Sequence, residues 1–133
     1  MALCVVKLLL KFGRNLNHAP EAPRQSTRSM LYTRFKALVE EHFEEHRSLQ
    51  AYADLMQISA KHLGETVKQC TGQSALYCIH ERIIHEAEYL LVHTFLSVKE
   101  IAFALSFEDA SHFTRFFKKY KQTTPREFRN HYT

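Results

Sequence analysis

The sequence predicts an all-α protein built from two copies of one helical unit, which a long helix joins. Helical apolar periodicity recurs along most of the chain, and no segment alternates apolar and polar residues with period two. Only three glycines and three prolines occur in 133 residues, so few positions break a helix. Residues 48–58 also resemble residues 97–107 at a constant offset of 49, which indicates a duplication.

The periodicity predicts seven helices in one domain, residues 31–133. We expect them at about 31–46, 48–56, 60–71, 74–93, 97–105, 109–120 and 125–131. Residues 2–12 are apolar with a helical pattern, and residues 13–30 contain Pro, Asn, Ser and Arg without a period. Residues 1–30 are therefore expected to form an apolar helix and a linker outside the domain.

Each copy shows the same order of signals. A serine, Ser48 or Ser97, stands at a helix start, and the second begins a capping box. A three-residue turn follows, and then a helix whose inward residues lie four apart. The corresponding pairs are Ala53 with Ala102, Leu63 with Phe113, and Val67 with Phe117. This is a helix-turn-helix pattern. We expect Phe107 to fix the second turn by burial, and Ser106 or Asp109 to cap the next helix.

The second helix of such a unit lies in the major groove of DNA. Helical spacing from the inward residues leaves two sets of side chains facing outward: Lys61, Gly64, Glu65 and Lys68 in the first copy, and Ala110, Ser111, Thr114, Arg115 and Lys118 in the second. Arg115 is suited to guanine, whose O6 and N7 a guanidinium binds together, and Glu65 to cytosine N4. Lys68 and Lys118 are suited to phosphates. His112 is predicted either to contact DNA or to pack against the linker helix.

The charge is unevenly distributed. Residues 1–30 hold five Lys and Arg against one Glu, whereas residues 31–133 hold thirteen of each sign. Residues 40–54 are acidic, and residues 109–133 carry six basic residues against Asp109 and Glu127. The six are Arg115, Lys118, Lys119, Lys121, Arg126 and Arg129. A basic segment at the second unit agrees with a nucleic-acid partner.

Catalytic and metal sites are not expected. The segment HERIIH, residues 80–85, resembles a zinc-protease motif but separates its histidines by five positions, so they do not share a helix face. His42 and His46 could hold a metal, yet they lie among four glutamates on an expected solvent face. The three cysteines match no ligand spacing and are read as reduced thiols. Arg82 could pair with an acidic residue of either unit.

The first twelve residues, MALCVVKLLLKF, are too short to span a bilayer and lack the positive start of a secretory signal. We therefore expect no membrane association. The Phe-rich residues 103–117 are expected in the core, because Phe113 and Phe117 correspond to apolar residues of the other copy.

The run SVKEIAFALSFEDASHFTRFFKKYKQTTPREFR resembles the signature segment of the AraC/XylS family of bacterial transcription regulators. The first half fits through Tyr52-Ala53, Leu63, Gly72 and the segment IHERIIHEAEYLL. The likeness covers residues 34–131. It implies a homeodomain-like domain whose two helix-turn-helix units enter successive major-groove segments of double-stranded DNA, in a cytoplasmic, nucleoid-associated bacterial protein without a cofactor.

The sequence departs from this family in two ways. Gln57, Ser106 and Gln122 stand where glycine is common, and each costs roughly 1 kcal/mol if the backbone keeps a positive φ. The family also usually carries an N-terminal sensing or dimerisation domain, of which residues 1–12 would be a remnant. An alternative function stays open: a short form that binds RNA polymerase or a full-length relative through residues 1–46. The acidic residues Glu40, Glu41, Glu44 and Glu45 motivate it. A homodimer through the N-terminal segment is a separate expectation.

Overall fold

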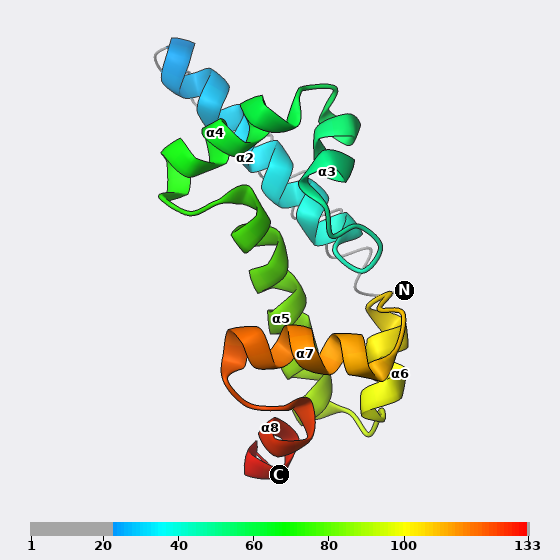
Figure 1. Ribbon diagram of the computed structural model, residues 1–133. Coiled ribbons are helices and arrows are strands. Elements are labelled where there is room, and N and C mark those ends of the chain that lie inside the picture. Colours follow the sequence, from blue (N-terminus) through cyan, green and yellow to red (C-terminus); the bar gives the residue numbers. More distant parts are fainter. Residues whose placement is uncertain (1–22, 133) are drawn as a thin grey trace.

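The computed structural model describes residues 23–132, and every regular element in this range is a helix. The helices are α2 (Pro23–His42), α3 (Leu49–Met56), α4 (Ala60–Thr71), α5 (Ala75–His93), α6 (Val98–Ala104), α7 (Ala110–Lys121) and α8 (Pro125–Tyr132). The all-α prediction, with seven helices in these residues, is confirmed. Figure 1 shows α2, α3 and α4 at one end of α5, and α6, α7 and α8 at the other.

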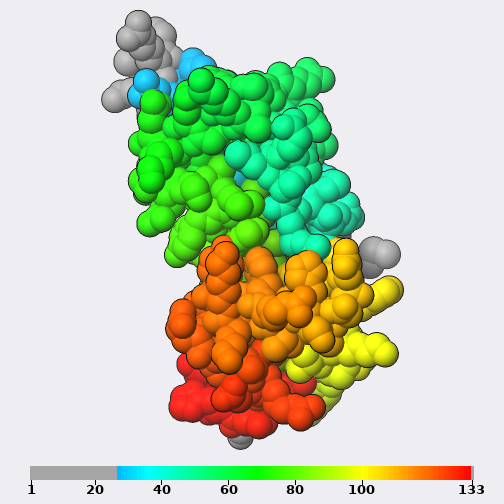
Figure 2. All heavy atoms as spheres, viewed as in Figure 1, coloured from blue at the N-terminus to red at the C-terminus, as the bar shows by residue number. Residues whose placement is uncertain are grey.

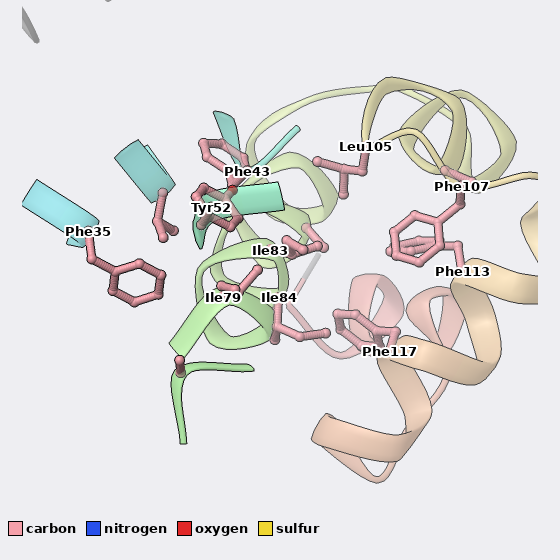
Figure 3. Close-up of a cluster of buried hydrophobic side chains, with 14 of the residues drawn as sticks. Phe35, Phe43, Tyr52, Ile79, Ile83, Ile84, Leu105, Phe107, Phe113 and Phe117 are labelled. Atoms are coloured by element: carbon pink, nitrogen blue, oxygen red, sulfur yellow. The ribbon is translucent and has the colours of Figure 1, made fainter. Parts of the chain in front are cut away.

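Helix α5 is the long linker that the sequence predicts, and both units pack on it. Its buried face carries Ile79, Ile83, Ile84, Ala87 and Leu91, spaced three and four residues apart. Side chains of the first unit meet one end of this face and those of the second unit meet the other, so one continuous core runs through the domain (Figure 3).

Serine and aspartate caps decide where several helices begin. Ser48 and Ser59 accept hydrogen bonds from the amides of Ala51 and His62 at 3.1 and 3.0 Å. Asp109 Oδ1 accepts from the His112 amide at 2.7 Å, as expected for the start of α7. Ser97 and Glu100 form a reciprocal capping box at α6. These side chains satisfy amides that have no partner inside the helix.

The start and end of α2 differ from the prediction. The helix was expected at about 31–46, but it begins at Pro23 and ends at His42. Proline is favoured in a first helical turn, because its missing N–H would have no partner there. Residues 23–30 are therefore helical and do not belong to a linker. The expected helix at 2–12 and the rest of the linker lie outside the described residues.

Three non-glycine residues adopt the left-handed conformation, as the sequence comparison anticipated. Gln57, Ser106 and Gln122 have φ values of 58°, 63° and 64°, and Gly72, the counterpart of Gln122, has 76°. Gln57 and Ser106 follow α3 and α6, and Gln122 follows α7. The turns thus keep the geometry that glycine serves best, at a strain of roughly 1 kcal/mol per non-glycine residue.

Phe107 lies buried in the middle of the second turn, with 5% of its surface exposed. Its ring contacts those of Phe113 and Phe116 at centroid distances of 5.3 and 5.2 Å. The predicted burial of Phe107 in the turn is confirmed. It also answers how two helices can meet there without glycine or proline: burial of an aromatic ring stabilises the turn.

Candidate nucleic-acid interface

Helices α4 and α7 are the second helices of the two units, and they lie on one face of the molecule. In Figure 1, α4 passes in front of α2, and α7 passes in front of α5. Figure 2 shows the same face, with residues of α4 in green and those of α7 in orange below them. Each helix is held from behind by inward residues, Leu63 and Val67 in α4 and Phe113 and Phe117 in α7, all fully buried.

Helix α4 presents the predicted charged residues to solvent. Lys61, Glu65 and Lys68 are all exposed, one turn after another. Gly64 was expected to face outward but is half-buried, and a Cβ built on it would lie 3.6 Å from Leu49 of α3. An added Cβ would therefore make an ordinary van der Waals contact with α3. Thr66 is also buried, and its hydroxyl donates to the His62 carbonyl at 2.9 Å.

Helix α7 presents Ser111, Arg115 and Lys118 to solvent. Ala110 and Thr114, which the spacing also placed outward, are half-buried and line a groove between α6, α7 and α8. Within the described part of the chain, the Arg115 guanidinium has no hydrogen bond or ion pair. It is therefore available to a ligand from outside.

Among the six basic residues in positions 109–133, the structure separates those with internal partners. Lys121 Nζ lies 3.4 Å from Glu88 of α5. Arg129 Nε donates to the Leu91 carbonyl at 2.9 Å and so satisfies the end of α5. Lys119 lies near the Tyr120 ring, at 5.9 Å from its centroid. Arg115 and Arg126 are exposed without such partners among the described residues, and Lys118 is exposed beside Glu127.

His112 packs inside the domain. It is half-buried, and its ring meets the edge of Phe107 at a centroid distance of 5.3 Å with an interplanar angle of 90°. Its aromatic partner is the Phe107 ring in the turn of its own unit. A contact of His112 with DNA stays a prediction.

Two grooves flank the recognition helices at equivalent places in the two units. One, of about 430 Å³, is lined by Leu49, Gly64, Lys68, Ser74 and Leu76, among others. The other, of about 730 Å³, is lined by the counterparts Val98, Thr114, Thr124 and Arg126, and also by Lys99. Lys99 is an exposed cation that the helical spacing did not predict, because it lies on α6 and not on the second helix of the unit.

The two units differ in charge. Residues 49–76 carry Lys61 and Lys68 against Asp54 and Glu65, which leaves no net charge. Residues 98–126 carry six basic residues against Glu100, Glu108 and Asp109. The groove of the second unit is cationic, and that of the first is largely neutral, which favours phosphate at the second.

The structure shows which acidic residue pairs with Arg82, the arginine of the linker helix. Arg82 pairs with Glu40 of α2, and its guanidinium carbon lies 4.1 Å from the centroid of the Phe43 ring. Glu40 therefore belongs to an internal ion pair, which removes it from the acidic patch that motivated a protein partner. Separately, His42, Glu45 and His46 bring three possible ligand atoms within 4.8 Å of one another near the end of α2.

The fold and this face define a double helix-turn-helix DNA-binding domain. A family model described as a helix-turn-helix domain matches residues 52–131. The chain belongs to this family, the AraC-type helix-turn-helix proteins. The resemblance seen in the sequence is thereby confirmed.

Curated relatives are transcription regulators and not enzymes. The transcriptional activator RhaS of Enterobacter sp. (strain 638) is 34% identical over 93 residues, covering 70% of this chain and 34% of RhaS. RhaS of Escherichia fergusonii is 36% identical over the same length. The chain thus spans about a third of the length of these relatives.

Solved structures show the same architecture. The C-terminal domain of the response regulator yesN from Fusobacterium nucleatum superposes with a TM-score of 0.68 at 27% identity, covering 74% of this chain and 96% of that domain. An AraC-type regulator from Chromobacterium violaceum gives 0.70 at 26% identity, with coverages of 81% and 96%. The DNA-binding domain of AdpA, solved with a target DNA, shares the fold with a TM-score of 0.68 at 21% identity and coverages of 75% and 90%. Among the described helices, none is long and apolar enough to cross a membrane.

Proposed function

We propose that this chain binds double-stranded DNA sequence-specifically by placing α4 and α7 in successive segments of the major groove. The carrying observation is that both helices lie on one face (Figure 2). They present charged side chains to solvent, and buried residues hold them from behind. Two such helices one helical turn of DNA apart would occupy about 20 base pairs.

Base readout falls to a few side chains in this proposal. Arg115 is exposed without a partner among the described residues, and its guanidinium can donate to guanine O6 and N7 together. Ser111 lies one turn before it on the same exposed face. In α4, Lys61 and Glu65 occupy the positions that correspond to Ser111 and Arg115. A carboxylate where the other unit has a guanidinium predicts different bases in the two half-sites, hence an asymmetric operator.

Phosphate contacts come chiefly from the second unit. Lys118, Lys99 and Arg126 are exposed around α7 and its groove, whereas Lys68 is the main cation beside the groove of the first. Cations on phosphates position the protein without reading sequence. The second unit is therefore expected to supply most of the salt-dependent affinity.

Selection of bound duplexes from a random library at physiological salt tests this function. The expected result is an enriched asymmetric motif that spans two major-groove segments. Binding that falls with salt but enriches no motif would contradict specific reading by this chain.

The alternative is an interaction protein that acts on RNA polymerase or on a full-length relative through residues 1–46. It requires assembly that is lost when residues 1–12 are removed. Activation of transcription and nucleoid association rest on specific DNA binding and follow only if the selection succeeds.

A further inference from the structure

The segment between α2 and α3 reaches across to the second unit through one side chain. Arg47 Nη1 donates to the carbonyl oxygens of Leu105 and Ser106 at 3.1 and 2.8 Å. Its guanidinium carbon lies 4.3 Å from the centroid of the Phe107 ring. One arginine of the first unit thus contacts three consecutive residues that form the turn of the second.

These contacts involve backbone groups of the turn that lack a helical partner or hold a strained conformation. The carbonyls at the end of α6 have no partner within the helix, and a cation stabilises them through the helix dipole. Ser106 holds a left-handed conformation that is strained for serine. Phe107 anchors α7 through Phe113 and Phe116. Arg47 therefore holds the point from which the second recognition helix departs.

The remaining hydrogen bonds and ion pairs of the second unit, within the described residues, reach no further than the linker helix. His80 of α5 bonds the Tyr120 hydroxyl, Glu88 pairs with Lys121, and the Leu91 carbonyl accepts from Arg129. A single helix that joins two units leaves their relative tilt open to bending. Arg47 supplies a second attachment, directly between the segment after α2 and the turn of the second unit.

We propose that Arg47 is a positioning residue that fixes the placement of α7 relative to α4 and thereby selects the spacing between the two DNA half-sites. The proposal rests on the function proposed above for its DNA consequence. The placement itself is a property of the free protein, so the two can be tested separately.

The first test needs no DNA. Spin labels are placed on the native Cys70, exposed on α4, and on a Ser111→Cys variant of α7, with Cys4 and Cys78 changed to serine. The unmodified Arg47 protein is expected to give one narrow distance distribution between the labels, and Arg47→Gln a distribution at least twice as broad. Equal widths would overturn the proposal. Arg34→Gln, which removes the charge of an exposed arginine on α2, is the matched control and should keep the narrow distribution.

The second test uses the duplex that the library selection returns, with one base pair inserted or deleted between its half-sites. Each such change rotates one half-site by about 35° relative to the other. The full chain is expected to lose affinity at least roughly tenfold, comparable to one mismatched base pair, and Arg47→Gln less than threefold. An unchanged spacing profile in Arg47→Gln would contradict the proposal.

A lysine variant separates the charge of Arg47 from the geometry of its guanidinium. Arg47→Lys keeps the charge but loses the planar guanidinium that lies over the Phe107 ring, so its spacing profile is expected to lie between those of the parent and Arg47→Gln. If Arg47→Gln does not fold, Arg47→Lys decides both tests. Failure of the unmodified chain to select any motif would count against the proposed function, and the label distances would still test the placement.

Discussion

Arg82 of α5 and Glu40 of α2 form a two-point ion pair, with Nε 2.7 Å from Oε2 and Nη2 2.9 Å from Oε1. Arg82 also reaches Glu86 at 3.3 Å and covers the Phe43 ring. The pair is half-buried, so solvent screens it less than an exposed pair. It ties the first helix of the domain to the linker helix.

Loss of this pair should destabilise the domain. Arg82→Gln removes the fork and leaves the Glu40 carboxylate without its partner in α5, and we expect the free energy of unfolding to fall by about 1 to 2 kcal/mol. Arg82→Lys keeps the charge but loses the second hydrogen bond. Its free energy of unfolding should therefore lie between those of the parent and Arg82→Gln. Urea denaturation of the three proteins measures this. A stability of Arg82→Gln equal to that of the parent would show that the pair contributes nothing.

Glycine at the left-handed positions should stabilise the fold. Ser106→Gly and Gln122→Gly remove a steric cost at φ values of 63° and 64°, and each is expected to raise the free energy of unfolding by up to about 1 kcal/mol. Greater freedom of glycine in the unfolded chain offsets part of this gain. Thermal unfolding checks the prediction.

The reverse substitution is the control for these two. Gly72→Gln places a side chain at φ 76°, at the position that corresponds to Gln122. A Cβ there meets nothing within 4 Å, so any loss reports backbone strain and not a clash. We expect a loss of about 1 kcal/mol. A stabilising effect of Gly72→Gln would contradict the account of these turns.

His80 should make stability depend on pH. Burial lowers the pKa of its ring below the ordinary value near 6.5, and the nearby Lys119 and Arg47 lower it further. The folded state therefore binds fewer protons than the unfolded state just below pH 6.5. This contribution to stability is fully present above that pH and is lost as the pH falls toward the folded pKa.

The corresponding measurement compares urea denaturation at pH 7.5 and 5.5. We expect the parent to lose more stability between these values than His80→Asn, in which the titrating ring is absent. His85→Asn, at an exposed position of the same helix, is the matched control and should behave as the parent. Identical pH dependence in the parent and His80→Asn would refute this role.

Much of this fold could be predicted because local signals mark it. Ser48 and Ser97 announce helix starts, and Phe107 matches Ile58 across the repeat. The beginning of α2 could not be predicted, since residues 27–30 are exposed and show no buried stripe. The partners of Arg47 and Arg82 were also out of reach. Leu105 lies 58 residues from Arg47, and a single sequence does not say which distant groups meet.

The exposed residues of the candidate interface were predicted more completely than the contacts that hold α4 and α7 in place. Helical spacing from Leu63 and Phe113 placed Lys61, Glu65 and Arg115 on the exposed side correctly. It failed for Gly64, Ala110 and Thr114, which are half-buried beside neighbouring helices, because spacing defines a helix face but not what packs beside it.

Lys118 should contribute affinity without specificity. Lys118→Ala is expected to weaken binding to all duplexes alike and to reduce the slope of log K against log salt by about one. Binding titrations over a range of salt concentrations on selected and scrambled duplexes measure both effects. A loss confined to the selected duplex would assign Lys118 to a base instead.

The central claim is that α7 reads bases through Arg115, and library selection repeated with Arg115→Ala tests it most directly. We predict that the variant selects the same asymmetric motif with one position relaxed, where the preference for guanine falls by about 1 to 3 kcal/mol. The other positions and the salt dependence of nonspecific binding should change little. A motif identical to that of the parent would contradict the account, because α7 would then not read DNA through this side chain.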